Sequence, residues 1–361
     1  MSGAPASARS AVTARLKAAD AAHAAALLTS GSVGAIPTET VYGLAARVDD
    51  LAAVARIFEA KGRPVFDPLI VHVRDITHAD TLGDLDAAPW IRPLLAVFWP
   101  GPLTVVVPAR PGAVDGLVTG GLPTVALRSP AHPLARAILE QSGLALAAPS
   151  ANRFGHVSPT TAAHVLADLD GRIDFVLDGG SCERGLESTI IGIGDDGAPT
   201  LLRAGALDRA VIADVVGQPV EQGVRVLERP LAPGQLARHY ATRHPMRLWE
   251  SYPARVPAPL DDERVLLAVV GCPAGATGIA MKNWPRFAQV ELLAAAGDWH
   301  EAAAGLYAFL RQLDEADVDR LEVVLAPDEA DLREAIADRL RRAAAPEPHP
   351  QSSDGSADHG G

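Results

Sequence analysis

The sequence predicts an α/β protein built from two units, and three observations support that prediction. The chain has 361 residues, too many for one ordinary domain and enough for two that each bury a core. Hydrophobic residues make up 48% of the chain and charged residues 21%, as in globular proteins. Short apolar runs alternate with helical patterns up to about residue 208, and the alternation returns after residue 246. We therefore expect a larger mixed α/β unit followed by a smaller one with a parallel sheet.

Composition also limits the classes of function. The net charge of −12 argues against a nucleic-acid or membrane binder, because phosphate contacts need a basic surface; we expect direct nucleic-acid binding to be weak or absent. The chain has no run of eighteen apolar residues and its start lacks the pattern of a secretory signal, which favours a cytoplasmic protein. Cys182 and Cys272 lie far apart without a ligand pattern, so we expect two buried thiols and neither a disulfide nor a zinc site.

The first unit is expected to span residues 20–208, after a flexible Ala/Ser-rich start at 1–19. GAIP and PLIVHV predict strands on either side of a helix in DDLAAVARIFEAKG. Further apolar runs predict strands at 103–107, 124–128, 144–148, 174–178, 188–193 and 199–203. One mixed, twisted sheet with flanking helices accommodates this number of strands.

Residues 209–245 are expected to connect the two units, since from residue 217 onward Pro and charged residues follow one another without periodicity. The second unit, at 246–344, predicts strand, helix, strand and helix in RVLLAVVG, DWHEAAAGLYAFLRQL, RLEVVLAP and DLREAIADRLRRA. This order is typical of a small parallel, Rossmann-like domain. Residues 345–361 have the composition of a disordered tail.

One glycine motif needs to be explained. Gly192, Gly194 and Gly197 have the GxGxxG spacing of dinucleotide-binding proteins, but APTLLRAG follows them and predicts a strand instead of the required helix. We therefore predict the turn of a β-hairpin. The sequence contains no GxxxxGK[ST], so ATP, if it binds, is held by another architecture.

The segment from Asp50 to Pro64 brings two cations to one loop. Its helix is expected to bury a stripe formed by Leu51, Val54, Ile57 and Phe58. Lys61 follows Ile57 by four residues and so points to the same side, and Gly62 ends the helix before Arg63. Two interpretations remain open here: Lys61 complements the helix dipole, or it binds a polyanionic ligand together with Arg63.

Strand parity directs further polar side chains to one side of the sheet. In PLIVHV, His72 and Ile70 point away from Leu69, Val71 and Val73, so His72 can face a cleft. By the same parity, Thr124, Ala126 and Arg128 share one face of the strand TVALR. In the strand LALAAPS, one face is shared by Leu144, Leu146, Ala148 and Ser150, and this strand ends near Asn152. A single His or Arg at a strand end is often structural, and only convergence of several favours a binding site.

Three more polar residues belong to this set. Ser158, followed by Pro159, predicts the N-cap of a helix, which can also receive a phosphate. Ser188 in ESTI and Arg203 in LLRAG lie on late strands of the same unit, where each alone indicates little.

Together, these motifs resemble those of the threonylcarbamoyl-AMP synthase family, whose catalytic unit is a YrdC-like domain. The resemblance covers residues 20–208 and rests on IPTETVYGL, KGRP, PLIVH, WPGPLT, TVALRSPAH, APSAN, ESTI and LLRAG in this order. The later ARHYA and the small α/β unit resemble the two-domain form of the family, in which a linker with a His-Tyr pair packs over the active site. The resemblance thus implies a YrdC-like fold followed by a C-terminal α/β domain.

The resemblance also implies site residues. The threonine site would be lined by Thr38, His72, Arg128, Ala148 and Ser188. ATP would be held by Lys61, Arg63, Thr124, Ser150, Asn152, Ser158, Arg203, His239 and Tyr240, with Lys61 and Arg63 catalytic. Two positions depart from the family pattern: Asp67 stands where the family usually has Asn, and Ala148 where it often has Ser or Thr.

The implied enzyme is a nucleotidyltransferase that makes threonylcarbamoyl-AMP and pyrophosphate from ATP, L-threonine and bicarbonate. The product would serve other proteins that modify a tRNA adenosine next to the anticodon. Such a transfer needs positioning and charge neutralisation more than a covalent nucleophile. Mg²⁺ would be held mainly by the ATP phosphates, with no dedicated protein ligands, and no organic cofactor is implied.

Two other functions remain open from the sequence. The first is an RNA-binding module, to which Arg47, Arg56, Lys61 and Arg63 would contribute, although the acidic total charge argues against it. The second is a carbamoyl-transfer enzyme using carbamoyl phosphate, because hydrogenase maturation proteins contain the same domain type. Those proteins also have acylphosphatase and zinc-finger regions, which this sequence lacks.

Overall fold

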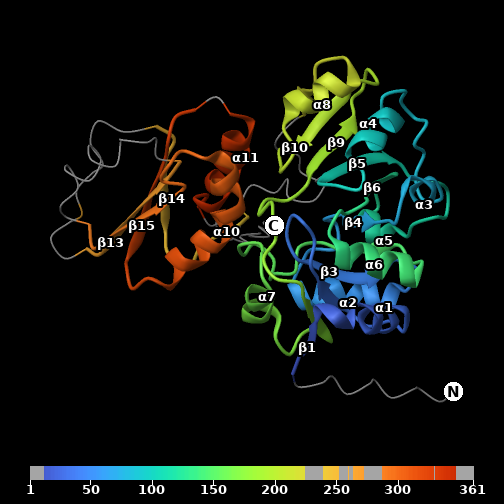
Figure 1. Cartoon of the computed structure of the whole chain (residues 1–361), viewed down its shortest axis with the longest axis horizontal. Coiled ribbons are helices and arrows are strands. Elements are labelled where there is room, and N and C mark those ends of the chain that lie inside the picture. The colour runs from blue at the N-terminus through green and yellow to red at the C-terminus, as the bar shows by residue number, and fades with distance from the viewer. Residues whose placement is uncertain are drawn as a thin grey trace, which may run out of the picture.

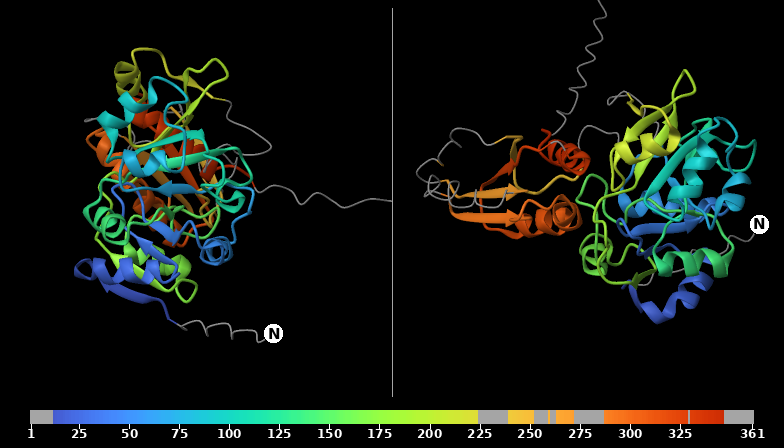
Figure 2. Two further views of the ribbon diagram at one scale, coloured as in Figure 1. Left: turned by 90° about the vertical axis from the view of Figure 1, so that its right-hand side faces the viewer. Right: turned by 45° about the horizontal axis from the view of Figure 1, so that its top comes forward.

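The computed structural model describes residues 12–223, 239–251, 259, 263–271, 287–328 and 330–346. They form two α/β units, the N-terminal one on the right of Figure 1 and the C-terminal one on the left. The right-hand view in Figure 2 also shows the two units side by side. The prediction of two α/β units with a large mixed sheet and a small parallel sheet is confirmed.

The N-terminal unit is built on a mixed sheet of eleven strands. Their order is β1-β8-β2-β3-β7-β4-β6-β5-β9-β10-β11. The bounds are β1 Ala14–Lys17, β2 Gly34–Ile36, β3 Gly43–Arg47, β4 Ile70–His72, β5 Leu103–Pro108, β6 Thr124–Arg128, β7 Leu146–Ala147, β8 Phe175–Asp178, β9 Thr189–Ile193, β10 Pro199–Arg203 and β11 Glu221–Gln222. Parallel pairs such as β4 with β6 alternate with antiparallel pairs such as β5 with β6, which makes the sheet mixed.

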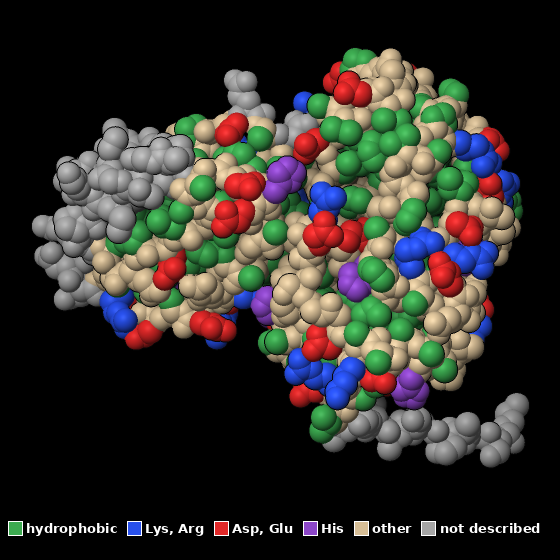
Figure 3. Space-filling view, in the orientation of Figure 1, with side chains coloured by type: hydrophobic (Ala, Val, Ile, Leu, Met, Phe, Trp, Pro, Cys, Tyr) green, Lys and Arg blue, Asp and Glu red, His purple; other side chains and the backbone are tan. Residues whose placement is uncertain are grey.

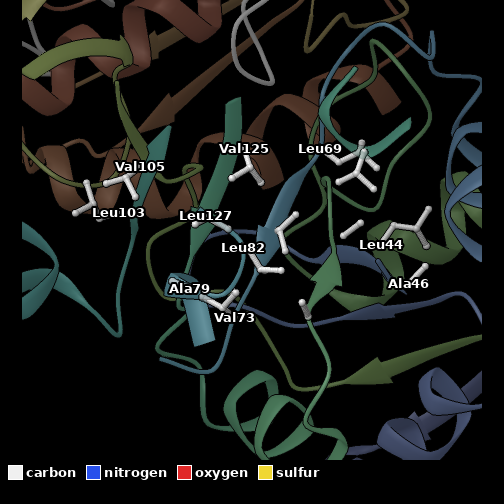
Figure 4. Packing of buried hydrophobic residues seen from close by; sticks show 14 of the residues in the cluster. Leu44, Ala46, Leu69, Val73, Ala79, Leu82, Leu103, Val105, Val125 and Leu127 are labelled. Atoms are coloured by element: carbon white, nitrogen blue, oxygen red, sulfur yellow. The ribbon is translucent and has the colours of Figure 1, made fainter. Parts of the chain in front are cut away.

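Helices cover both faces of this sheet. They are η1 Ala18–Asp20, α1 Ala21–Thr29, α2 Leu51–Lys61, α3 Ile76–Asp80, α4 Ile91–Phe98, α5 Gly116–Thr119, α6 Pro133–Ser142, α7 Ala162–Leu169 and α8 Arg209–Val216. Buried residues of α1 and α6 form one cluster with Ile36 and Phe175. Residues of α2, α4 and α7 form the main cluster with the opposite side of the strands, part of which is shown in Figure 4.

The predicted strand parity is confirmed for the strands that lead to the candidate site. Leu69, Val71 and Val73 belong to the main core, whereas Ile70 belongs to a small cluster on the other face. The predicted stripe on α2 is correct for Val54, Ile57 and Phe58 but wrong for Leu51, which is 44% exposed. Leu51 is the first residue of the helix and lies outside the stripe that faces the sheet.

Two boundaries of the first unit differ from the predicted ones. Residues 14–17 are not a flexible start, because β1 pairs in parallel with β8 at the sheet edge. Residues 209–216 are not part of the connection, because they form α8, which packs on α4 and buries Ile212. Backbone pairing thus attaches residues 14–17 to the first unit, and burial of Ile212 attaches residues 209–216. Residues 1–11, 224–238 of the connection and 347–361 of the tail lie outside the described residues.

The GxGxxG spacing belongs to a hairpin, as predicted. Strands β9 and β10 pair antiparallel around it, and the amide of Gly194 donates to the carbonyl of Ala198 at 2.8 Å. Gly197 has φ +82°, a left-handed conformation that favours glycine in such turns.

The C-terminal unit contains a parallel sheet of four strands in the order β12-β15-β13-β14. The bounds are β12 Met246–Trp249, β13 Val265–Val270, β14 Gln289–Leu293, β15 Arg320–Leu325, α10 Trp299–Glu315 and α11 Asp331–Ala343. Strands β12 and β14 were not predicted, because they are short and lack the continuous apolar runs of β13 and β15. Cys182 is buried as expected, and Cys272 lies outside the described residues.

The two units share one hydrophobic cluster. Val41, Val157 and Leu186 of the first unit pack with buried residues of α10 and α11. Gly185 lies so close to α10 that an added Cβ would come within 2.5 Å of the Ala303 carbonyl oxygen. The interface therefore has a close-packed centre and fixes the C-terminal unit against the segments on either side of Ser188. In the described part of the chain, no helix combines the length and hydrophobicity needed to span a membrane.

Candidate active site

A cavity lies at the junction of the large sheet and the inter-unit contact, and it encloses about 530 Å³ with its open mouth included. Its walls come from segments far apart in sequence. It is lined by Thr38, Thr40, Val41, Gly43, Arg63, Ile70, His72, Arg128, Ala148, Pro149, Ser150, Glu187, Ser188, Arg203, His239 and Tyr240. A cavity with several converging polar groups is where a small-molecule site is expected. A larger cavity between the units, of about 800 Å³, is lined by none of the predicted site residues.

Lys61 supports one wall of the cavity from behind. It is the last residue of α2 and is 3% exposed. Its Nζ donates to the carbonyl oxygens of Ser150 and Asn152 at 2.6 and 2.7 Å, which uses two of its three donor positions. Burial, together with the neighbouring Arg63, lowers the pKa of Lys61 well below its ordinary value. An incoming phosphate would favour the charged ammonium and raise that pKa again.

Arg63 lies in the cavity wall and is held by the loop that follows it. Its Nε and Nη2 donate to the carbonyl oxygens of Asp67 and Pro68, and Nη2 also pairs with the Asp67 carboxylate at 2.9 Å. Burial raises the pKa of Asp67, although Arg63 and Lys61 oppose that rise. The Asp67 carboxylate thus orients Arg63.

Arg128, at the end of β6, is paired with a glutamate that sequence analysis had not singled out. Its Nη2 donates to Glu39 at 2.7 Å and its Nη1 to the Thr40 hydroxyl at 2.9 Å. Burial would raise the pKa of Glu39, but the charge of Arg128 outweighs this and holds it below its ordinary value. Glu39 also accepts the backbone N–H groups of Ala131 and His132, so it ties the loop after β6 to the cavity.

His72 is the most incompletely bonded residue of the cavity. It is 2% exposed, and both ring nitrogens lack a hydrogen-bond partner in the described part of the protein. Burial and the nearby Arg128 lower the pKa of His72 to about 3, so the ring is neutral at pH 7. A neutral imidazole offers one donor and one acceptor, so a buried ring without partners among the described residues is suited to contact a polar ligand.

Ser188 and Arg203 form a bonded pair on the opposite wall. Arg203 donates from Nη2 to the Ser188 carbonyl and hydroxyl oxygens at 2.9 and 3.1 Å. The Ser188 hydroxyl also lies 2.7 Å from that of Thr104. Burial lowers the pKa of Arg203, and the carboxylate of Glu187 counteracts this. The arrangement places a guanidinium and a hydroxyl side by side at the cavity.

The predicted N-cap role of Ser158 is wrong. Helix α7 begins at Ala162, and Thr161 caps it by accepting the N–H of His164 at 3.2 Å. The carbonyl oxygen of Pro159 accepts the Tyr42 N–H at 2.9 Å, which holds this segment in a non-helical conformation. The Ser158 hydroxyl donates instead to Glu187 at 2.8 Å.

His239 and Tyr240 cover the cavity from the connecting segment. The amide of the next residue, Ala241, donates to the Gly155 carbonyl at 2.8 Å and fixes the segment to the first unit. The His239 ring packs edge-on against Phe154, with ring centroids 6.3 Å apart, and burial lowers its pKa to about 3. Tyr240 has φ +62°, a left-handed conformation costing roughly 1–2 kcal/mol that surrounding contacts must offset.

Most predicted site residues meet at the cavity, and four lie outside its lining. All five of the threonine set line it, as do Arg63, Ser150, Arg203, His239 and Tyr240 of the ATP set. The residues outside the lining are Lys61, Thr124, Asn152 and Ser158. Thr124 lies farthest along its strand, since it starts β6 and pairs with Pro108, four residues before Arg128.

Glu39 and Glu187 are the residues that sequence reasoning missed. Each is 6% exposed, and each directly adjoins a predicted site residue, Thr38 or Ser188. A carboxylate inside an otherwise apolar or small-residue motif was the available signal, since such a group is rarely buried without a cation. Their partners, Arg128 and Arg339, are remote in sequence and could not be assigned in advance.

The four cations proposed for RNA binding do not form a basic surface. Lys61 and Arg63 are buried, Arg47 pairs with Asp49, and Arg56 pairs with Asp174. On the face shown in Figure 3, Lys and Arg side chains are interspersed with Asp and Glu side chains. This mixture does not favour the phosphate contacts that RNA binding requires.

Sequence comparisons connect both units to known families. Residues 26–205 match a family described as telomere recombination, and residues 207–345 match one described as the threonylcarbamoyl-AMP synthase C-terminal domain. A threonylcarbamoyl-AMP synthase from Bacillus subtilis is 42% identical over 331 residues, which is 90% of this chain and 92% of that protein. One from Schizosaccharomyces pombe is 34% identical, covering 86% of this chain and 84% of that protein.

Structure comparisons agree with these matches. The crystal structure of Pyrococcus abyssi Sua5 complexed with L-threonine superposes with a TM-score of 0.78 at 33% identity, over 92% of this chain and 97% of that one. A second P. abyssi Sua5 structure, with alanine replacing a consecutive histidine and tyrosine, has a TM-score of 0.79 at 32% identity, over 92% and 96% of the two chains. The likeness therefore includes both units and not only the larger sheet.

Proposed function

Because this chain belongs to the threonylcarbamoyl-AMP synthase family, we propose that the cavity beneath His239 is where it joins ATP, L-threonine and bicarbonate. The chain is an ATP-using transferase that makes threonylcarbamoyl-AMP for tRNA modification. One observation carries the assignment to this cavity: buried polar atoms that have no hydrogen-bond partner among the described residues occur on His72 and His239 in its lining, and on Asp67 and Asn152 behind it. Buried polar groups are normally bonded, so their convergence favours a polar ligand.

ATP fits the cationic half of the cavity. Lys61, Arg63 and Arg203 are buried within or directly behind its walls, where a charge contact is worth more than in bulk water. We assign these three to the phosphates, with Ser150 and Asn152 beside them. The spare donor position of Lys61, next to two carbonyl bonds, is suited to a phosphate oxygen.

L-Threonine fits the half around Arg128 and His72. A guanidinium carries five N–H donors, so Arg128 can bind a carboxylate while it keeps its bond to Glu39. The neutral His72 can then accept from a hydroxyl or amine of the substrate. Thr38, Ala148 and Ser188 complete this half, and the small Ala148 leaves room for a side chain.

The reaction proceeds in two steps. The threonine nitrogen forms a bond to the carbon of bicarbonate with loss of water, which gives a carbamate. A carbamate oxygen then attacks the α-phosphorus of ATP, and the bond to the bridging oxygen breaks with departure of pyrophosphate. Lys61, Arg63 and Arg203 stabilise the charge on the phosphoryl oxygens, and no residue becomes covalently modified.

Mg²⁺ is the cation we propose for the bound nucleotide. In the described residues, no three His, Cys, Asp or Glu side chains converge as a metal site. We propose that this Mg²⁺ is held mainly by phosphate oxygens and water. When bound, the ion would neutralise part of the phosphate charge.

We further propose that His239 and Tyr240 shield the adenylate from water, since they cover the cavity and are themselves buried. The product would pass to proteins that transfer the threonylcarbamoyl group to tRNA. A cytoplasmic location fits this role, because ATP and tRNA are both available there.

A single assay tests the function. The protein is incubated with ATP, Mg²⁺, bicarbonate and labelled threonine, and pyrophosphate and a labelled adenylate are measured. We expect both products in equal amounts and neither without bicarbonate. Absence of the adenylate under these conditions would refute the proposal, and pyrophosphate release with carbamoyl phosphate in place of threonine would support the competing carbamoyl-transfer function.

A further inference from the structure

The contacts of Glu187 extend from the cavity into the C-terminal unit. Its Oε1 accepts the hydroxyl of Ser158 at 2.8 Å. Its Oε2 accepts the hydroxyl of Tyr307 at 2.6 Å, and the Nε and Nη2 of Arg339 at 3.2 and 3.0 Å. Tyr307 lies on α10 and Arg339 on α11. One carboxylate therefore joins a predicted ATP ligand to both helices of the other unit.

This carboxylate is ionised and enclosed. Burial would raise the pKa of Glu187, but Arg339 and Arg203 outweigh this and hold it at about 2. Arg339 is fully buried and also donates to the Ala204 carbonyl at 2.6 Å, next to Arg203. Neither charge can turn toward water, so removal of one partner leaves the other buried and uncompensated.

A second branch of contacts leads to the segment that covers the cavity. The Tyr307 ring stacks on Tyr240, with centroids 5.4 Å apart and planes 19° apart. The Arg339 guanidinium lies 5.8 Å from the centroid of the same Tyr240 ring. These two residues thus contact both Glu187 and the strained Tyr240, which directly follows His239.

We propose that Glu187, Tyr307 and Arg339 are positioning residues through which the C-terminal unit holds Ser158 and the His239-Tyr240 pair for nucleotide binding. The inference rests on the proposed function, since it assumes that ATP occupies this cavity. Tyr307 and Arg339 do not line the cavity, so they act on the nucleotide through Glu187 and Tyr240.

The alternative is that these residues only attach one unit to the other. Arg311 of α10 provides a matched contact for comparison: it donates to the Val157 carbonyl at 2.5 Å and pairs with Asp168 at 3.0 Å. It also bridges the units, but neither Arg311 nor its partners line the cavity. A pure attachment role would make the loss of Arg311 and the loss of the Tyr307 hydroxyl equivalent for catalysis.

The test is a double-mutant cycle on the full chain. Tyr307→Phe removes only the hydroxyl and keeps the ring on Tyr240, Glu187→Gln removes the charge, and Arg311→Met is the control. KM and kcat are measured for ATP and for threonine. The affinity for a non-hydrolysable ATP analogue is measured by calorimetry, and thermal midpoints are recorded for every variant.

We expect Tyr307→Phe to raise the KM for ATP about tenfold, as for a lost bond to a charged group, and to change the KM for threonine much less. In the Glu187→Gln background the same change should have little further effect. Arg311→Met should lower the thermal midpoint and leave the KM for ATP unchanged. The calorimetric affinity for the ATP analogue should fall in Tyr307→Phe and stay at the parent value in Arg311→Met.

Two results would overturn the inference: a KM for ATP unchanged in Tyr307→Phe, or one raised equally in Arg311→Met. Either result would mean that these contacts only attach one unit to the other. Failure of the proposed function is recognised separately, because the parent protein would then form no adenylate. The calorimetric affinity for the ATP analogue still measures the effect of Tyr307→Phe in that case.

Discussion

Buried polar and ionisable groups have different surroundings in the two units. At the cavity of the N-terminal unit, Asp67 and His72 have atoms without hydrogen-bond partners in the described structure. Among the described residues of the C-terminal unit the buried charged residues are Glu322 and Arg339, and each is bonded, whereas the partly buried Arg311 has one unpaired atom, Nε. Glu322 accepts from Trp249 and from Arg320, and Arg339 pairs with Glu187.

We interpret the unpaired groups at the cavity as ligand-binding residues, and the fully bonded buried charges as residues that stabilise the fold. An unpaired buried polar group is costly, and it persists where substrate supplies the missing partner. A fully bonded buried charge already has its partners within the protein. We therefore expect substitutions at the cavity to change kinetic constants, and substitutions at Glu322 to change stability.

The largest expected effect is that of Lys61→Ala. Loss of one preorganised donor to the phosphates should reduce kcat/KM for ATP by about 1,000-fold. The far-UV circular dichroism spectrum should stay that of the folded parent. Lys17→Ala, at an exposed position, is the matched control. Parent-like turnover in Lys61→Ala would show that Lys61 does not contribute to ATP binding. It would also count against the comparison between the cavity and the C-terminal unit.

Arg128→Lys should act on the other substrate. A lysine cannot reproduce the forked contact to a carboxylate, so the KM for threonine should rise by about 100-fold, with a much smaller change for ATP. Arg136→Lys, which alters a partly exposed pair with Glu140 on α6, should leave both constants unchanged. Equal changes in both KM values would mean that Arg128 supports the whole cavity and does not select threonine.

Glu322→Gln tests the other side of the comparison. Removing a buried, fully bonded charge should lower the free energy of unfolding by about 2 kcal/mol, measured with urea. Both KM values should remain those of the parent, in contrast to Glu187→Gln at the cavity. A change in the KM for ATP would show that the C-terminal sheet influences the site more broadly than through Glu187.

The smallest effect, taken per pH unit, concerns the pH dependence of stability. Burial lowers the pKa of His72 and of His239 from 6.5 to about 3, so between these values the unfolded chain binds protons that the folded chain does not. Their contribution to stability is full above pH 6.5 and is lost as the pH falls. His239→Phe should reduce the slope of the free energy of unfolding against pH in this window by about 1.4 kcal/mol per pH unit.

The measurement is the free energy of urea unfolding at several pH values. His300→Phe, at an exposed position, serves as the control and should keep the parent slope. An unchanged slope in His239→Phe would mean that the ring is already accessible to protons in the folded protein, and that the cover over the cavity is open.

Much of the site was predictable because it depends on local rules. Strand parity predicted which residues share a face with His72 and with Arg128 on their own strands, and the helical repeat placed Lys61 on the buried side of α2. Gly62 ends the helix in the left-handed conformation, as its position indicates. The order of the motifs then identified the family, which the comparisons confirmed.

Other features depend on partners that no local pattern reveals. Ser158 has the residue type of an N-cap, but its hydroxyl donates to Glu187, and Thr161 is the N-cap of the helix. Strand β1 forms because β8, far along the chain, offers a free edge. Glu39 and Glu187 are buried only because Arg128 and Arg339 compensate their charge.

The sequence by itself determined the α/β class, the two units, the faces of the main strands and helices, and the family. The class, the units and the faces follow from residue spacing along the chain, and the family follows from the resemblance of the motifs. Only the tertiary structure decided which charges pair, which polar atoms stay unpaired, and how the C-terminal helices reach the cavity. The physical reason is that the free energy of a buried charge depends on groups brought near it by folding, whatever their distance in sequence.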